Sequence, residues 1–461
     1  MNIRFGTSGW RAVIAEDFTF ANVRKVTESI CGYLKASGSS NRIIVGHDSR
    51  FMGERFAQFA ADIFAAKGFT VLLCGEPTPT PTVSHAIIAE SAAGAINFTA
   101  SHNPPEYQGI KFSTADGAPA LPEITKLIEA GISDGTAIED VPGGTILHYD
   151  PRPSYLLDLA GKVDLDLIAA AKGRYAYDPL WGTGRNYLDK ILRDSGLEVE
   201  TLHDWRDVTF GGRAPEPAEG HLDELRNAVL SGRLTLGLAT DGDGDRFGVI
   251  DSNGEFIAPN RLVALLTDYL AESRGWQLGV ARSVATSHLI DRVAKDRGLK
   301  LYETPVGFKF IGELINKDEI ILGGEESAGL SIRGHYPEKD GIIACLLAAE
   351  AVAARGKSLS QQLDELTARI GDLSSGRIGV KLTDDVAAIL KEKLAQEPNE
   401  IGGRRIASIN RMDGVKFLFE DGSWMLMRPS GTEPMVRIYA ESERKQDLEV
   451  LLEQGRQYLL G

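Results

Sequence analysis

The sequence predicts an α/β protein of several domains, because short apolar strand patterns alternate with longer helical patterns along most of the chain. Residues 42–46 form a β-branched, apolar run that is typical of a buried strand. A helical pattern follows over 51–67 and ends at Gly68, and 70–73 is the next predicted strand. This alternation is typical of βαβ units in a parallel or mixed sheet.

The same alternation recurs in two later parts of the chain. In the second part we predict strands at 174–177 and 234–240, with a helix after Gly184. The third part contains the following predicted elements: helix 261–272, strand 280–284, helix 287–297, strand 320–322 and helix 341–354. Each part therefore has the pattern of a separate α/β unit.

The pattern changes after Gly371. Closely spaced strands are predicted there, followed by a C-terminal helix: 406–410, 415–420, 424–427 and 435–440. Asp413-Gly414 and Asp421-Gly422 supply turn signals between them, which predicts a small α+β domain. A chain of 461 residues is expected to form three or four domains. We place these domains at 1–149, 150–250, 251–370 and 371–461.

Composition argues against several classes of protein. The 50 basic and 65 acidic residues give a net charge of −15, which disfavours nonspecific nucleic-acid binding. The three cysteines lie far apart in apolar stretches, which predicts reduced core residues. The N-terminal residues lack the apolar segment of a secretory signal, and the longest apolar run, 342–354, is too short to span a bilayer. We expect a cytoplasmic protein with no membrane partner.

Residues 99–105 (TASHNPP) are a candidate nucleophile loop, because they directly follow the predicted strand 95–98. Ligands of α/β sheets bind at the carboxyl ends of strands. Pro104 and Pro105 stiffen the loop and prevent a helix from starting there. A serine presented in this way can form a covalent intermediate. Taken alone, the segment could equally be a simple turn.

Residues 241–246 (DGDGDR) predict a metal site just after the strand that ends at Thr240. The alternating glycines permit the sharp turns that fold three carboxylates around one point. Such hard oxygen ligands suit Mg²⁺ or Ca²⁺. An EF-hand would need glycine and glutamate where this loop has Arg246 and Ser252. We therefore favour a catalytic Mg²⁺ whose coordination shell a phosphoryl group completes.

Two later loops carry weaker signals. Residues 323–329 (GGEESAG) offer glutamate and serine side chains that can hydrogen-bond to sugar hydroxyls. Residues 428–434 (RPSGTEP), with Arg437 beyond them, combine arginine, hydroxyl groups and an open backbone, which suit phosphate. Each segment alone could also be a surface turn.

Together the four loops, in this order, resemble the α-D-phosphohexomutase family. The opening residues 5–11 (FGTSGWR) add to the resemblance, which runs nearly end to end. It implies three topologically similar α/β domains with mixed sheets. A fourth, C-terminal α+β domain similar to the TATA-box-binding protein is also implied, and the four surround a central cleft.

The resemblance also implies roles for residues at matching positions. Ser101 is expected to be the phosphoserine, whose phosphate holds one Mg²⁺ together with Asp241, Asp243 and Asp245. The residues expected near the transferred phosphoryl group are Lys111, Arg246, Arg11 and His102. We expect Lys111, and after it His102, to manage the proton of the sugar hydroxyl. The residues expected to contact the substrate are Gly307, Glu325, Ser327, Lys339 and Arg282. The residues expected to bind the non-reacting phosphate are Arg428, Ser430, Gly431, Thr432 and Arg437.

The expected substrate is glucose 1-phosphate or glucose 6-phosphate, with glucose 1,6-bisphosphate as intermediate and activator. The run Glu325-Glu326-Ser327 looks like the glucose-type sugar loop. Phe308 stands where many dual-specificity members have histidine, so a histidine role does not transfer. A mannose, dual-specificity or glucosamine mutase stays open as an alternative, as do a metal-dependent phosphatase and a Ca²⁺-binding or sugar-sensing module. Monomer and homodimer are both compatible with the sequence.

Overall fold

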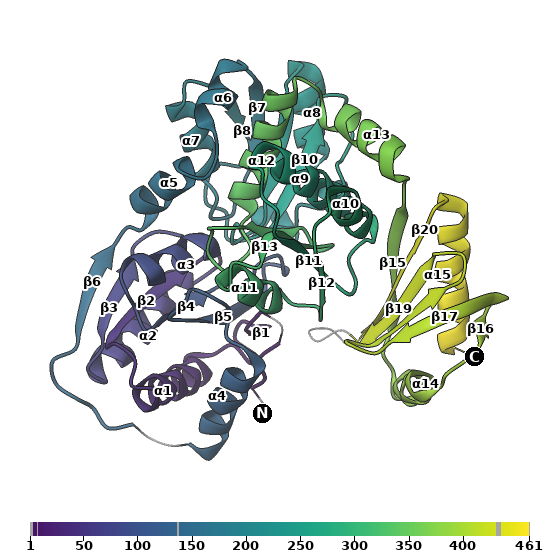
Figure 1. The fold of residues 1–461 in the computed structure, drawn as a ribbon. Coiled ribbons are helices and arrows are strands. Elements are labelled where there is room, and N and C mark those ends of the chain that lie inside the picture. The colour runs from purple at the N-terminus through teal and green to yellow at the C-terminus, as the bar shows by residue number, and fades with distance from the viewer. Residues whose placement is uncertain (1–2, 7, 136–137, 430–434, 461) are drawn as a thin grey trace.

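The computed structural model describes residues 3–6, 8–135, 138–429 and 435–460. Four sheets succeed one another along the chain, and we call the units built on them domains I to IV (Figure 1). Domains I to III are mixed α/β units, and domain IV is an antiparallel sheet with helices on one face. The predicted fold class is confirmed. No helix among the described residues combines the length and apolar character that a bilayer crossing requires.

Domain I is a six-stranded sheet with the order β1-β5-β4-β2-β3-β6, in which β5 runs antiparallel to β1 and β4. Helices α1, α2 and α4 pack on one face and α3 on the other. Its elements are β1 (Trp10–Val13), α1 (Phe20–Ala36), β2 (Arg42–His47), α2 (Gly53–Ala66), β3 (Thr70–Cys74), α3 (Thr80–Ala89), β4 (Gly94–Phe98), β5 (Tyr107–Thr114), α4 (Pro122–Asp134) and β6 (Thr145–Tyr149).

Domain II has the strand order β10-β9-β7-β8. Its elements are α5 (Arg152–Ala160), α6 (Leu165–Ala170), β7 (Arg174–Asp178), α7 (Leu188–Asp194), β8 (Glu198–Thr201), α8 (Asp223–Gly232), β9 (Leu236–Thr240) and β10 (Phe247–Asp251), with short 3₁₀ turns at Phe210–Gly212 and Glu219–His221. Strands β9 and β10 form an antiparallel pair, so a short loop joins them, and this loop contains the three aspartates.

Domain III has the strand order β12-β11-β13-β14. Its elements are α9 (Pro259–Ser273), β11 (Gly279–Ser283), α10 (Leu289–Arg297), β12 (Leu301–Thr304), α11 (Phe308–Asn316), β13 (Ile320–Glu325), β14 (Gly329–Ile332), α12 (Gly341–Arg355) and α13 (Leu359–Ile370). Helix α12 is buried along most of its length and packs against β9, β10 and α6 of domain II. The hydrophobic core is therefore continuous across domains II and III.

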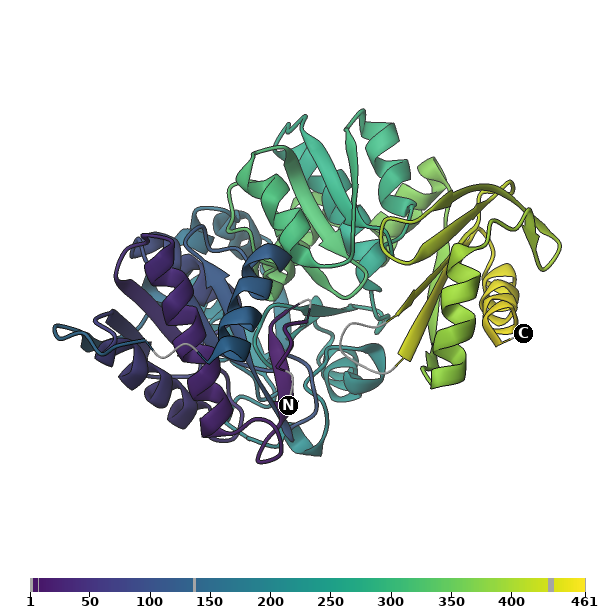
Figure 2. The same cartoon turned by 90° about the horizontal axis from the view of Figure 1, so that it is seen from below.

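Domain IV is a separate unit with its own core. Its elements are β15 (Ser374–Lys381), α14 (Asp384–Ala395), β16 (Glu400–Ile401), β17 (Arg404–Asn410), β18 (Val415–Phe419), β19 (Trp424–Pro429), β20 (Met435–Ser442) and α15 (Lys445–Leu460). The strand order is β15-β20-β19-β18-β17-β16. Both helices cover one face of the sheet (Figures 1 and 2). The opposite face turns an apolar cluster, including Trp424 and Tyr439, toward domain III.

Candidate active site

Two loops from different domains meet at the centre of the site. Ser101 follows β4 of domain I, and residues 241–245 connect β9 to β10 in domain II. The hydroxyl of Ser101 donates a hydrogen bond to Oδ2 of Asp241 over 2.7 Å, and both side chains are buried. The structure therefore places the candidate nucleophile directly against a candidate metal ligand.

The backbone at Ser101 adopts an unusual conformation. Its φ is +52°, in the left-handed region that residues other than glycine seldom adopt. The backbone N–H of Ser101 donates to Oγ1 of Thr99 over 2.8 Å, which helps to hold this turn. Such conformations cluster at functional sites, where the surroundings enforce them.

Arg50 is the side chain that fixes the serine loop. It is fully buried and pairs with Asp48 over 3.1 Å. Its guanidinium donates to four backbone carbonyls at 2.6 to 3.0 Å, three in the loop (Ser101, Asn103 and Pro104) and that of Tyr107 at the start of β5. Arg50 was not predicted from the sequence, where the one signal is an Asp-Ser-Arg run just after a strand.

Glycines let the metal loop approach the serine loop closely. A Cβ at Gly242 would lie 2.7 Å from the carbonyl oxygen of Ser101, so no larger residue fits. Gly244 has a φ of +73°, which glycine adopts without strain. The resulting turn gathers Asp241, Asp243 and Asp245, all fully buried, with ligand oxygens within 4.8 Å of one another.

Two buried lysines offset part of this negative charge. Nζ of Lys111, on β5, lies 2.6 Å from Oδ2 of Asp243 and 2.7 Å from Oδ2 of Asp245. Lys339 pairs with the same Asp245 oxygen. Burial alone would lower the pKa of Lys111, but the two aspartates outweigh burial and raise that pKa. Lys111 therefore stays positively charged at the site.

The remaining oxygens of the aspartates fit a divalent cation. Oδ1 of Asp243 and Oδ1 of Asp245 are buried and lack a hydrogen-bond partner in the described part of the chain. Burial, and then repulsion from its two neighbours, raises the pKa of Asp241 well above its ordinary value. A hard cation would satisfy these oxygens and relieve the repulsion, and Mg²⁺ prefers carboxylate ligands. The donor set therefore fits Mg²⁺.

Oγ1 of Thr80, which was not predicted, donates to Asp243 over 2.6 Å.

Two further predicted side chains lie at the serine loop. Nδ1 of His102 lies 3.3 Å from the hydroxyl oxygen of Ser101. Nη1 of Arg11 donates to Oδ1 of Asn103 over 2.6 Å. Burial, together with the positive charges of Arg246 and Arg11, lowers the pKa of His102 well below its ordinary value. The imidazole is therefore neutral near pH 7.

The predicted sugar loop begins where β13 ends. Glu325 is buried and accepts a hydrogen bond from the backbone N–H of Gly307 over 2.8 Å, so the structure brings these two predicted residues together. Burial and the neighbouring Glu326 raise the pKa of Glu325 to about 7. Its carboxyl group can therefore donate or accept a hydrogen bond near neutral pH.

A cavity of about 230 Å³ adjoins the site between domains II, III and IV. Ser327 and Arg246 line it, as do Arg377 and Tyr439 from domain IV. The backbone N–H of Arg246 is fixed by a 3.0 Å hydrogen bond to Oδ1 of Asp241. The cavity therefore extends from the end of the metal loop, past the sugar loop, to the sheet of domain IV.

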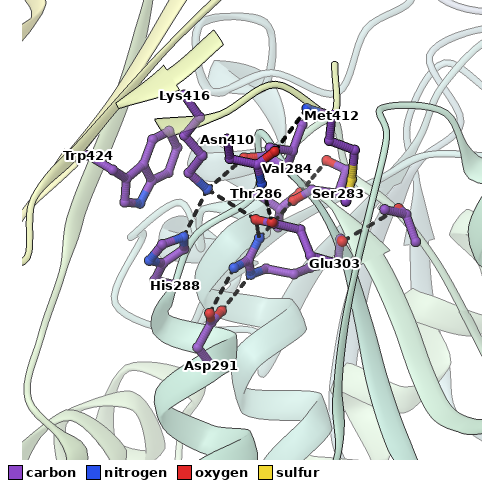
Figure 3. A network of polar contacts seen from close by, with 12 residues as sticks. Ser283, Val284, Thr286, His288, Asp291, Glu303, Asn410, Met412, Lys416 and Trp424 are labelled. Atoms are coloured by element: carbon purple, nitrogen blue, oxygen red, sulfur yellow. Dashed lines mark hydrogen bonds and ion pairs between the residues drawn. The ribbon is translucent and has the colours of Figure 1, made fainter. Parts of the chain in front are cut away.

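Arg282 lies in a different environment from the other predicted residues. Its guanidinium is buried, and it pairs with Asp291 over 2.7 Å and with Glu303 over 2.7 Å. Both partners belong to domain III, and they form part of the network in Figure 3. The structure does not bring Arg282 together with Ser101. Arg282 supports the contact between domains III and IV indirectly, because its partner Glu303 also binds Asn410 and Lys416 of domain IV.

Two arginines predicted to bind the non-reacting phosphate lie on neighbouring strands of domain IV, Arg428 on β19 and Arg437 on β20. Arg428 and Arg437 are direct cross-strand partners, so their side chains share one face of the sheet. Nε of Arg428 lies 2.8 Å from Oδ2 of Asp413. Ser430, Gly431 and Thr432 lie outside the described residues.

Family models match the chain in four consecutive parts. They describe the α/β/α domains I, II and III and the C-terminal domain of phosphoglucomutase/phosphomannomutase. The matched residues are 2–139, 153–254, 258–370 and 378–455.

Similar proteins span nearly the whole chain but carry different sugar names. A phosphoglucomutase from Komagataeibacter xylinus is 31% identical, with 95% of this chain and 87% of that protein covered. A probable phosphoglucosamine mutase from Methanosphaera stadtmanae is 30% identical, with 99% and 98% covered. A crystal structure from Thermus thermophilus, provisionally described as a phosphomannomutase, is 34% identical, covers 100% of both chains and has a TM-score of 0.88.

The four-domain fold and its serine–aspartate site define a phosphohexomutase. The chain belongs to the phosphoglucomutase/phosphomannomutase family, which is the α-D-phosphohexomutase family. The resemblance stated from the sequence is thereby confirmed.

Proposed function

We propose that this chain interconverts glucose 1-phosphate and glucose 6-phosphate, with Ser101 as the phosphoryl carrier and glucose 1,6-bisphosphate as the intermediate. The observation that carries the proposal is the position of the Ser101 hydroxyl. It lies 2.7 Å from Asp241, beside two further buried carboxylates that each have one oxygen without a hydrogen-bond partner among the described residues. A phosphoryl group on this serine would offer its oxygens as further ligands to a cation that the three carboxylates hold.

Two features support glucose over the alternative sugars. The run Glu325-Glu326-Ser327 resembles the glucose-type sugar loop, and position 308 lacks a titratable side chain. Phe308 is buried in an apolar cluster with Ile311 and Ile315, so it fills space and transfers no proton. Mannose, dual-specificity and glucosamine mutases are the alternatives, since relatives of similar identity carry those names.

The reaction would proceed by two phosphoryl transfers. Phospho-Ser101 gives its phosphoryl group to the free hydroxyl of the sugar phosphate, so one P–O bond breaks at the serine and another forms at the sugar. The bisphosphate then turns over in the site, and its other phosphoryl group returns to Ser101. Phosphoryl transfer asks mainly for alignment and charge stabilisation. Mg²⁺, when bound to the aspartates, supplies positive charge to the phosphoryl oxygens.

The side chains of the site would divide the remaining tasks. Lys111 is held as a cation, so its task is to offset charge on the transferred group. His102 is neutral and lies 3.3 Å from the serine hydroxyl, so it, rather than the cationic Lys111, would carry the proton from the sugar hydroxyl to the serine oxygen as the phosphoryl group moves the other way. Glu325 and Ser327 would bind sugar hydroxyls, and Arg428 with Arg437 would bind the non-reacting phosphate.

An assay with purified enzyme tests the proposal. The enzyme is incubated with Mg²⁺, a trace of glucose 1,6-bisphosphate and each of glucose 1-phosphate, mannose 1-phosphate and glucosamine 1-phosphate. We expect the highest kcat/KM for glucose 1-phosphate, with glucose 6-phosphate as product. A higher kcat/KM for either other sugar would contradict the glucose preference, and release of free sugar would indicate a phosphatase.

A further inference from the structure

One segment of domain IV, residues 410–416, lies against domain III. Nζ of Lys416 donates to the carbonyl oxygen of Val284 over 2.8 Å, and Nδ2 of Asn410 donates to Oε2 of Glu303 over 2.6 Å. Figure 3 shows these contacts, with Trp424 beside Lys416. Val284 and Glu303 lie at the carboxyl ends of β11 and β12. The parallel strand β13 ends with Glu325 at the same edge of the sheet. The segment therefore docks at the edge that carries the sugar loop.

The turn inside this segment is packed tightly against β19. Gly414 has a φ of +84°, and a Cβ there would lie 2.4 Å from the carbonyl oxygen of Met427 and 3.1 Å from Cα of Arg428. Only glycine tolerates both conditions. The turn therefore fixes Asp413 beside Arg428.

Asp413 joins the two domains through a single oxygen. Its Oδ2 accepts a hydrogen bond from Nε of Arg428 over 2.8 Å and another from the backbone N–H of Val306 over 3.0 Å. Asp413 is 24% exposed and Arg428 12%, so water screens this contact only in part. Among the described residues, no contact engages either Nη group of Arg428.

The loop at Val306 also holds the sugar loop. The next backbone N–H, that of Gly307, donates to Oε1 of Glu325 over 2.8 Å. Two consecutive amides of one loop therefore bind Asp413 of domain IV and Glu325 of domain III. Pro305 restricts the backbone of this loop, because its ring fixes φ.

We propose that Asp413 is a positioning residue that links phosphate binding by Arg428 to sugar binding by Glu325. The carboxylate binds Nε of the guanidinium, which leaves both Nη groups for a phosphate. Through the amide of Val306, the same carboxylate also anchors the arginine to the loop that binds Glu325. The inference rests on the proposed function, because Arg428 has this task only if the chain binds a sugar phosphate there.

Steady-state kinetics of Asp413→Ala test the inference. The variant loses both hydrogen bonds, so we expect KM for the preferred sugar phosphate to rise about tenfold while kcat changes less than about threefold. Asp413→Asn keeps an oxygen acceptor without the charge, and its KM should rise by about threefold. The matched control is Asp421→Ala, in the next turn of the same sheet, where the side chain pairs with Arg404 at the surface. Its kinetic constants should not change.

A double-mutant cycle separates positioning from general damage to the fold. In an Arg428→Gln background, Asp413→Ala should raise KM by less than about twofold, because it acts through the arginine that is already gone. An equal rise in both backgrounds, an unchanged or lowered KM, or a loss confined to kcat would overturn the inference. If Asp413→Ala does not fold, KM is compared in the same two backgrounds with Asp413→Asn in its place. A wild-type enzyme without mutase activity would overturn the proposed function, and this inference with it.

Discussion

Nη2 of Arg50 lies 2.7 Å from the carbonyl oxygen of Ser101, a residue 51 positions later in the chain. The same guanidinium binds two more carbonyls of the serine loop and the carbonyl of Tyr107, where β5 begins. A planar group with five donors can hold such a set, whereas a lysine ammonium cannot. The left-handed conformation of Ser101 therefore depends on a buried arginine that does not touch the serine hydroxyl.

Arg50→Lys should weaken both the fold and the reaction. The substitution keeps the positive charge beside Asp48 but leaves buried carbonyls without a donor. We expect the free energy of unfolding to fall by about 3 kcal/mol. We expect kcat to fall by about 100-fold, because the serine is no longer held in place. Urea unfolding and a mutase assay measure the two effects. Arg55→Lys, at an exposed position of α2, is the matched control and should change neither quantity.

Ser101→Ala should abolish turnover while the fold persists. The variant lacks the oxygen that carries the phosphoryl group, so we expect kcat to fall by at least about 1,000-fold. Intact-protein mass spectrometry should detect one phosphoryl group on the wild-type enzyme and none on the variant. Turnover in the variant at the wild-type rate would refute the covalent mechanism.

The class of the fold was predictable because local patterns encode it. Apolar, β-branched runs such as 42–46 bury both faces of a strand, and helices such as α2 and α10 follow such strands at helical length. The antiparallel strand β5 was not predicted. It alternates polar residues with apolar ones, and its pairing with β1 and β4 is a property of the assembled sheet. Its Lys111 was found only through the family resemblance.

The candidate site was predictable wherever its residues lie in one short loop. Asp241, Asp243 and Asp245 are such a case, because the intervening glycines are visible in the sequence. Contacts between distant segments left no local signal. Arg50 with the serine loop and Asp413 with Val306 are examples, since each joins residues through backbone atoms that every residue type carries.

Mg²⁺ should stabilise the protein through the three aspartates. A cation that binds only the folded state at 100 times its Kd adds about 2.7 kcal/mol to the free energy of unfolding. We therefore expect the thermal midpoint to rise when Mg²⁺ replaces EDTA. Asp243→Asn should lose most of this increase together with activity, because a ligand oxygen is removed. Asp421→Asn is the control and should keep it. An equal increase in Asp243→Asn would place the cation elsewhere.

Lys416 should make the stability of the protein increase at alkaline pH. Its ammonium group is buried beside Trp424 at the contact between domains III and IV, where Glu303 lies 3.4 Å away. Burial, and then the positive charge of Arg282, lowers the pKa of Lys416 from 10.5 to about 8 in the folded protein. Between these values the unfolded chain binds the proton and the folded protein does not. Stability therefore rises with pH across this window and is independent of this group below pH 8.

A pH series with two variants isolates the effect. A pKa difference from 10.5 to about 8 corresponds to about 3 kcal/mol across the window. Lys416→Met removes the titrating group and keeps a similar volume, so the free energy of unfolding of wild type minus variant should increase by up to that amount between pH 8 and pH 10.5. Lys391→Met, at an exposed position of α14, should leave the pH dependence of the wild type unchanged. A difference between wild type and Lys416→Met that stays constant with pH would show that the lysine keeps its proton in the folded protein, held by Glu303 more strongly than burial opposes it.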